Sequence, residues 1–163
     1  MAINEALWRG LKDGVISVVS SDHSAHAQEA KDPGWQDIFQ APFGMIGVET
    51  VAPPTYYEGV VRRNFPLTWF AKVMSENPAR IFGLYPRKGI IQVGSDADIT
   101  ILDPEKEVII KTDHLHSKAG YCVYEGWKVK GYPVMTVLRG HVLLDQGQLQ
   151  KGPGFGSAVY PGP

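Results

Sequence analysis

Residues 15–26 read Val-Ile-Ser-Val-Val-Ser-Ser-Asp-His-Ser-Ala-His, and this stretch decides the predicted fold. Residues 15–19 are short, β-branched and apolar on both faces, which is typical of a strand covered on both sides in a parallel sheet. The stretch then turns polar, so that Asp22 and His23 follow the predicted carboxyl end of the strand. Barrel and doubly wound enzymes carry their chemistry at that end. We therefore expect functional side chains here.

Helices are predicted on both sides of this strand. Residues 4–12 have the apolar spacing of a helix that Asn4 can cap and that Asp13-Gly14 ends. Residues 26–42 are polar and contain a turn signal, so a long loop with little regular structure is expected. The other expected helices are residues 48–63, interrupted or restarted at Pro53-Pro54, a helix that begins at Pro66, and residues 77–83 with Asn77 as N-cap.

The pattern changes from helix to strand after Tyr85-Pro86. The expected strands are 90–93, 98–102, 108–110, 134–138 and 142–144, with hairpin connections at 139–141 and 145–147. We expect an α/β chain in which residues 1–85 form the helical part with its parallel strand and residues 86–150 form a small all-β sheet or sandwich. Residues 151–163 are rich in Gly and Pro and are expected to be a tail that crosses a surface or a neighbouring subunit.

Composition excludes several classes of protein. The chain has 163 residues, 44% of them hydrophobic, and a formal net charge of -1, which suits one or two globular units and argues against nucleic acid as a partner. Its single cysteine, Cys122, excludes an internal disulfide and a thiolate metal cluster and is expected to be a buried apolar residue. No apolar run approaches the ~20 residues of a membrane helix, and no signal peptide is recognised, so a cytoplasmic location is expected.

The polar residues that follow the predicted strand suit hydrolytic chemistry. Asp22 could bind a metal ion and transfer a proton, and His26 could return to the same pocket from the following loop. His23 could support the site or shape the turn. Asp and Ser are also common turn and capping residues, so the pattern alone leaves a structural role open.

Five stretches, in order, resemble landmarks of the cyclic amidohydrolases, the group of dihydroorotases, hydantoinases and allantoinases. They are residues 21–26 (SDHSAH), 41–50 (APFGMIGVET), 76–84 (ENPARIFGL), 94–98 (GSDAD) and 124–131 (YEGWKVKG). The resemblance implies that the chain is the C-terminal part of a TIM-type (β/α)8 barrel followed by part of a small all-β sandwich domain. It also implies a small cyclic amide as substrate and assembly into a homo-oligomer.

The resemblance assigns roles to individual residues. The aspartate that matches Asp22 binds one ion of a two-metal centre, expected to contain zinc, and is the catalytic base that relays a proton from metal-bound hydroxide to the leaving amide nitrogen. The histidine that matches His26 contacts the substrate in dihydroorotases, and residues 41–44, with Ala41, Pro42 and Gly44, resemble the substrate-binding loop. His26 and Phe43 depart from the hydantoinase pattern, whereas residues 124–155 are more similar to hydantoinases and allantoinases, so the expected substrate is divided between these classes.

Most of the family's metal ligands have no counterpart here. A complete barrel takes about 250 residues, so a chain of 163 cannot hold one. His114-Leu115-His116 spells the His-x-His of a metal pair, but it follows a predicted strand of the β part and is expected to lie in a surface loop. The chain alone is therefore expected to be inactive until the missing N-terminal barrel part is supplied. Two alternatives stay open: a non-catalytic truncated relative that serves as an oligomerisation or interaction module, and a segment that refolds into a compact non-barrel domain.

Overall fold

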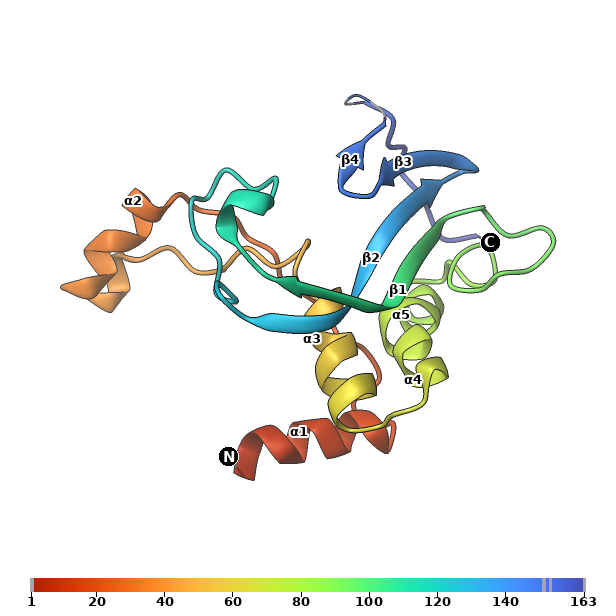
Figure 1. Cartoon of the computed structure of the whole chain (residues 1–163), viewed down its shortest axis with the longest axis horizontal. Coiled ribbons are helices and arrows are strands. Elements are labelled where there is room, and N and C mark those ends of the chain that lie inside the picture. Colours follow the sequence, from red (N-terminus) through yellow and green to blue (C-terminus); the bar gives the residue numbers. More distant parts are fainter. Residues whose placement is uncertain (1, 151, 153, 163) are drawn as a thin grey trace.

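The computed structural model describes residues 2–150, 152 and 154–162, with a helical part followed by a single sheet (Figure 1). The longer helical stretches are α1 (Ala2–Lys12), α3 (Ala52–Tyr56) continued by the π-helix Tyr57–Arg62, and α4 (Leu67–Ala71) continued by the π-helix Lys72–Glu76 and α5 (Asn77–Ile81). Short helices are α2 (Gln28–Lys31) and the 3₁₀ turns Asp32–Trp35, Ile38–Gln40 and Thr112–His114. The strands are β1 (Ile99–Ile109), β2 (Lys128–Leu138), β3 (His141–Asp145) and β4 (Gln148–Leu149).

The helical part packs around an aromatic cluster. α1 presents Trp8 to Phe65 and Trp69, with ring centroids 6.4 and 6.3 Å away, and the buried Val73 completes the cluster. The helix predicted at residues 4–12 is thereby confirmed, although Asn4 lies inside it because the helix begins at Ala2. No helix of the described residues is long and apolar enough to cross a membrane.

The strand predicted at residues 15–19 is wrong. Its contacts run to helices instead: the Val19 N–H donates to the Val73 carbonyl at 3.2 Å, and the Asn77 amide donates to the Ser17 carbonyl at 2.7 Å. Val15 is 84% exposed. A strand requires a neighbouring strand, and none pairs with residues 15–19 in the described part of the chain, so this apolar segment does not join a sheet.

The other helix predictions are partly right. Residues 26–42 contain α2 and two 3₁₀ turns and form an arm that extends to the left of the molecule in Figure 1, where the sequence predicted little regular structure. Residues 52–62 are helical, whereas residues 48–51 of the same prediction are not. The two helices expected from Pro66 and at residues 77–83 form one continuous stretch, residues 67–81. Asn77 is not an N-cap, because its backbone is helical and continues from the preceding π-helix, which frees its side chain to reach Ser17.

The sheet is antiparallel with strand order β1-β2-β3-β4. The predicted strands 98–102 and 108–110 merge into β1, whose register against β2 shifts between Asp103 and Glu107. Both hairpin connections are confirmed, since Arg139-Gly140 and Gln146-Gly147 each have two positive φ angles, as a type I′ turn requires. Residues 90–93 are not a strand, and Val93 is fully exposed. No second sheet faces this one among the described residues, so the sandwich and the division at residue 85 stay predictions.

Helix α3 packs on the sheet where β2 has a glycine. A Cβ on Gly131 would lie 2.1 Å from Cε1 of the buried Tyr56 ring, and the Gly131 φ is +91°. The neighbouring Val129 is the most completely buried core residue, and it packs with Ile110 and Cys122, whose predicted burial is confirmed. The glycine therefore sets the distance between helix and sheet.

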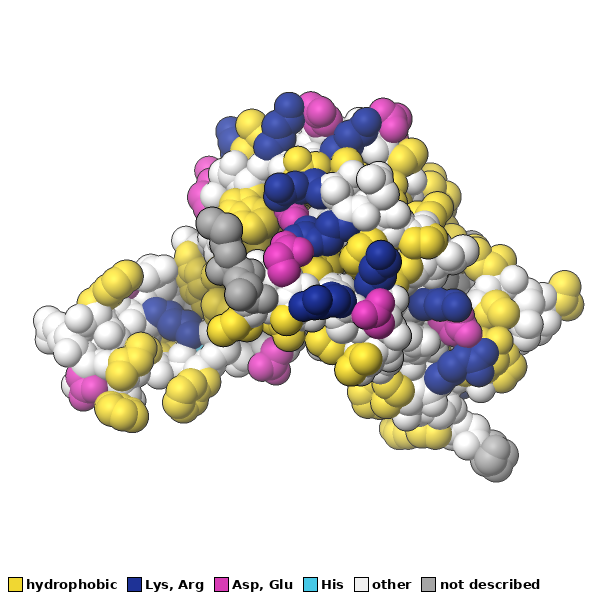
Figure 2. Space-filling model, turned by 90° about the horizontal axis from the view of Figure 1, so that it is seen from below, with side chains coloured by type: hydrophobic (Ala, Val, Ile, Leu, Met, Phe, Trp, Pro, Cys, Tyr) yellow, Lys and Arg dark blue, Asp and Glu magenta, His cyan; other side chains and the backbone are white. Residues whose placement is uncertain are grey.

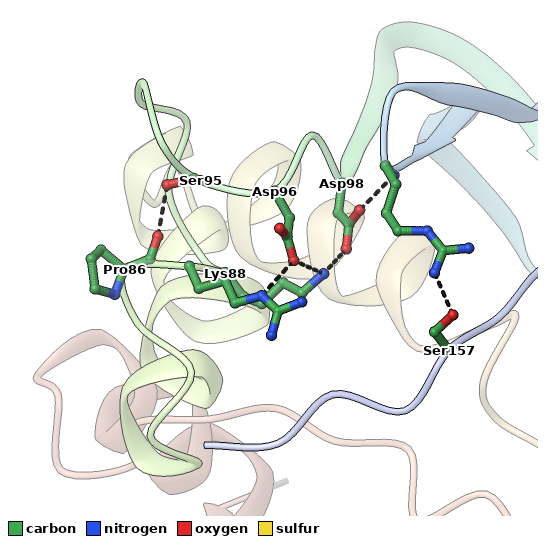
Figure 3. A network of polar contacts seen from close by, with 8 residues as sticks. Pro86, Lys88, Ser95, Asp96, Asp98 and Ser157 are labelled. Carbon is green, nitrogen blue, oxygen red and sulfur yellow. Dashed lines mark hydrogen bonds and ion pairs between the residues drawn. The ribbon is translucent and has the colours of Figure 1, made fainter. Parts of the chain in front are cut away.

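An ion-pair network joins the segment after α5 to the sheet (Figure 3). The Lys88 ammonium lies 2.8 Å from Asp96 and also pairs with Asp98, while the Arg87 guanidinium reaches Asp96 at 2.9 Å. Asp98 accepts from the Arg139 N–H at 2.8 Å, and the Arg139 side chain donates to Ser157 in the tail. The carboxylates of Asp96 and Asp98, which directly precede β1, are thus both held by cations.

Replacing Gly131 with alanine should loosen the contact between helix and sheet. The added Cβ displaces Tyr56 and is strained at positive φ, so we expect a loss of about 2–4 kcal/mol in unfolding free energy. Gly126 is the matched control, because its φ of +79° is similar and its Cβ would meet nothing within 4 Å. Gly126→Ala should cost about 1 kcal/mol. Equal losses in urea unfolding would contradict the packing described.

The Lys88 network should make stability depend on pH in the acid range. The hydrogen bond from Lys88, with help from Arg87, lowers the pKa of Asp96 below its ordinary value of 3.8. The folded state therefore binds fewer protons than the unfolded state, so this contribution is present above about pH 4 and is lost as pH falls through the lowered pKa. We expect the wild-type thermal midpoint to fall more steeply between about pH 5 and pH 2 than that of Lys88→Met. Parallel curves would refute this role for the network.

Candidate functional site

The two sequence stretches with the most promising chemistry lie side by side. His23 and Met45 form an isolated parallel bridge, and the Ser24 N–H donates to the Met45 carbonyl at 2.9 Å. The approach depends on glycine: a Cβ on Gly44 would lie 2.3 Å from the Ser24 Cβ, and one on Gly47 would lie 3.0 Å from the Ser21 Cβ. Residues 21–26 and 41–48 therefore form one structural unit, which we call the Asp22 unit.

Asp22 lies at the surface of this unit. Its backbone has a φ of +47°, in the left-handed region that Asp tolerates better than most residues. Its side chain is exposed, and among the described residues its carboxylate takes part in no hydrogen bond or ion pair. The expected position of Asp22 at the end of a buried strand is therefore wrong, because that strand is absent. The carboxylate is nevertheless accessible and uncommitted, as a proton acceptor or metal ligand must be.

His23 shapes the unit. Its Nδ1 accepts hydrogen bonds from the backbone N–H groups of Gly47 at 3.0 Å and Val48 at 3.2 Å. An imidazole nitrogen that accepts carries no proton, so in this arrangement the His23 proton sits on Nε2. Of the two roles that the sequence left open for His23, the contacts correspond to the second, in which it shapes the local turn.

His26 and the loop at residues 41–44 lie in the same unit. His26 is half-buried, and its Nε2 lies 3.3 Å from the Ser24 hydroxyl. The loop is held from the arm by Lys31, whose ammonium donates to the Pro42 carbonyl at 2.6 Å and also to the Gly44 carbonyl. Ala41 packs closely against Gly34, where a Cβ would lie 2.6 Å away. The residue pattern identified the loop, but nothing in it identified Lys31 as its partner.

A narrow crevice beside the Asp22 unit joins it to the loop before β2. It is lined by His23, residues 46–50, Leu115 and Ser117. Glu49 accepts from the His116 N–H at 2.9 Å and lies 2.8 Å from the His116 Nδ1. His114 and His116 are exposed, which agrees with the surface loop that was predicted in place of a metal pair.

The described residues bring together no metal centre. No group of three or more His, Cys, Asp or Glu side chains converges in the described part of the chain in a way that could hold a metal ion. Asp22 and His26 could supply two donors at most, whereas catalytic zinc sites use three protein ligands.

The Asp22 unit belongs to a chain with many relatives. The profile of the amidohydrolase family matches residues 4–143. The L-hydantoinase of Paenarthrobacter aurescens is 40% identical over 157 residues, which cover 96% of this chain and 34% of that protein. The dihydroorotase of Methanosarcina acetivorans is 42% identical over 154 residues, which cover 93% of this chain and 32% of that protein.

Solved structures are similar as well. The D-hydantoinase (dihydropyrimidinase) of Thermus sp. superposes with a TM-score of 0.90 at 33% identity, over 94% of this chain and 33% of that one. The chain thus spans about a third of the length of the relatives it matches. Because the family profile covers most of the described residues and their fold is kept among these relatives, the chain belongs to the amidohydrolase family.

Proposed function

We propose that this chain supplies one part of the active site of a hydrolase that cleaves ring amide C–N bonds in cyclic ureides or dihydropyrimidines. The observation that carries the proposal is the Asp22 unit, in which an exposed, uncommitted carboxylate and a glycine-dependent loop are held together. The names of the relatives, hydantoinase and dihydroorotase, support the substrate class. The reaction consumes water and opens the ring.

Asp22 is the proposed catalytic base. As the oxygen of water forms a bond to the ring carbonyl carbon, its proton passes to the Asp22 carboxylate. The same proton then moves to the ring nitrogen, and the C–N bond breaks to leave an amine or ureido group and a carboxylic acid, which releases the other proton of the water to solvent. The exposed position of Asp22 suits this role, because a relay must reach both the water and the leaving nitrogen.

The neighbouring residues are proposed to bind the substrate. The His26 imidazole lies within the unit, beside the Ser24 hydroxyl, and would donate to a substrate oxygen. Ala41, Pro42 and Gly44 would form the wall of the pocket. The glycine at position 44 keeps that wall close to the Asp22 segment. A ring substrate would then lie between the carboxylate and the loop.

The complete protein is proposed to bind two divalent metal ions, with zinc as the expected metal and Asp22 as one ligand. The chemistry such ions supply is polarisation of the ring carbonyl and a lower pKa for bound water. The described residues provide too few donors, so the remaining ligands would come from polypeptide outside these 163 residues, within a TIM-type barrel and a sandwich completed by that polypeptide. Assembly as a cytoplasmic homo-oligomer is part of the same proposal.

The test is a chimera, because the chain covers only a third of its relatives. Residues of this chain replace the matching 34% of the L-hydantoinase of Paenarthrobacter aurescens, and hydrolysis of hydantoin, dihydropyrimidine and dihydroorotate is measured with zinc present. We expect turnover of at least one substrate by the chimera and none by the 163-residue chain alone. Asp22→Asn in the chimera should lower kcat by about 10²–10⁴, because the amide cannot accept the proton.

Asp113→Asn is the matched control, because Asp113 is also exposed but lies in the 3₁₀ turn before β2. It should leave kcat unchanged. An Asp22→Asn chimera as active as Asp113→Asn would overturn the assignment of the base. Turnover by the isolated chain would overturn the need for further polypeptide.

A second candidate function is an interaction or oligomerisation module without catalysis. It is favoured by the arm and the loop that follows it, where Trp35, Phe39 and Phe43 are each about nine-tenths exposed. Figure 2 shows hydrophobic side chains over the lobe at the left of the molecule, whereas charges of both signs cover the centre. Large exposed aromatic side chains are typical of interaction surfaces. The chimera separates the two candidates, since a module that has lost the catalytic geometry would give no turnover.

A further inference from the structure

Hydrogen bonds join the loop at residues 42–48 to three earlier residues, of which Lys31 belongs to the arm, and Ile46 of the loop is buried in the core. His23 accepts from the N–H groups of Gly47 and Val48, and the Ser24 N–H bonds the Met45 carbonyl. These contacts fix the later half of the loop to the Asp22 segment. The earlier half, residues 42–44, is bonded to the Lys31 ammonium.

The charged side chain of Lys31 bonds backbone carbonyls rather than a carboxylate in the described part of the chain. The side chain is half-buried, and among the described residues it has no carboxylate within ion-pair distance. Two of its three N–H donors are committed to backbone carbonyls, those of Pro42 and Gly44. Hydrogen bonds from a charged donor are stronger than those between neutral groups, and a bond to each side of Phe43 restricts the backbone on both sides of that residue.

The stretch held by Lys31 has little packing at Phe43, and its other close contact is that of Gly44 with Ser24. Phe43 is 90% exposed, so its side chain contributes little packing, and Gly44 has a φ of +98° that other residues rarely adopt. Glycine has wide conformational freedom, so the bond from Lys31 to the Gly44 carbonyl helps to restrict the backbone at this position. Lys31 lies eleven residues before Pro42 and reaches it from the end of α2, so this side chain adds a polar contact between α2 and residues 42–44 to the packing of Ala41 against Gly34.

We infer that Lys31 is a positioning residue, which joins the arm to residues 42–44 and fixes the shape of the proposed substrate loop. This inference rests on the proposed function for the role of the loop, but not for the contact itself. Lys31 does not touch the reacting atoms in this account. Its loss should therefore weaken substrate binding while leaving the proton relay at Asp22 in place.

The structural test is limited proteolysis of the 163-residue chain with chymotrypsin, which cleaves after Phe. Phe43 lies in the stretch that Lys31 holds, whereas Phe39 is equally exposed and lies in the 3₁₀ turn Ile38–Gln40. In Lys31→Met, cleavage after Phe43 should accelerate about tenfold or more relative to cleavage after Phe39, because local opening becomes easier. Lys31→Arg keeps donors at the end of a long side chain and should restore most of the resistance. Lys72→Met, at an exposed helical lysine, should change neither site.

The kinetic test uses the same three variants in the hydantoinase chimera. Lys31→Met should raise KM about tenfold with kcat within about threefold of the unsubstituted chimera, and Lys31→Arg should recover most of the change. An unaltered cleavage ratio in Lys31→Met would overturn the inference whatever the activity. An altered ratio with an unchanged KM, in a chimera that turns over, would overturn the link to substrate binding. If the unsubstituted chimera shows no turnover, the proposed function fails, and the cleavage ratio alone decides whether Lys31 holds the loop.

Discussion

The close approach of Ser24 to Gly44 is the constraint on which the candidate site depends. A Cβ at position 44 would overlap the Ser24 side chain at 2.3 Å, so only glycine lets the two backbones lie this near. The bond from the Ser24 N–H to the Met45 carbonyl and the two bonds to His23 form only because the segments are in contact. Without this approach, Asp22 and the loop at residues 41–44 would be separate surface features.

A glycine also permits a close approach where the helical part meets the sheet. Gly131 lets Tyr56 pack directly on β2, and the Lys88 network ties the segment after α5 to the start of β1 and to Arg139. These two contacts between the helical part and the sheet depend on different interactions. The first is a packing contact, and the second weakens when Asp96 is protonated.

Local patterns in the sequence predicted much of the fold. The helix at α1 follows from apolar spacing, and the two hairpins follow from Arg139-Gly140 and Gln146-Gly147, because turn chemistry acts over a few residues. The prediction failed at residues 15–19, since an apolar β-branched run becomes a strand only beside another strand. It failed at Asn77 because a preceding π-helix carries the chain through that position.

For the site, the sequence identified the right stretches but not their geometry. The resemblance selected residues 21–26 and 41–50, and these are the segments that come together. Lys31 and Glu49 were missed, because each acts on a residue distant in sequence, on Pro42 and on His116. No spacing rule within a single sequence records such a pairing. The exposed position of Asp22 was missed because it was inferred from a strand at residues 15–19 that does not form.

Amide hydrogen exchange at Ser24 tests the central constraint most directly, because its N–H spans the two segments. Gly44→Ala is compared with Gly94→Ala, whose φ of +95° is nearly that of Gly44 at +98° but whose Cβ would meet nothing within 4 Å. The account predicts that Ser24 exchanges about 10- to 100-fold faster in Gly44→Ala and at the wild-type rate in Gly94→Ala. Equal Ser24 exchange rates in the two variants would contradict it.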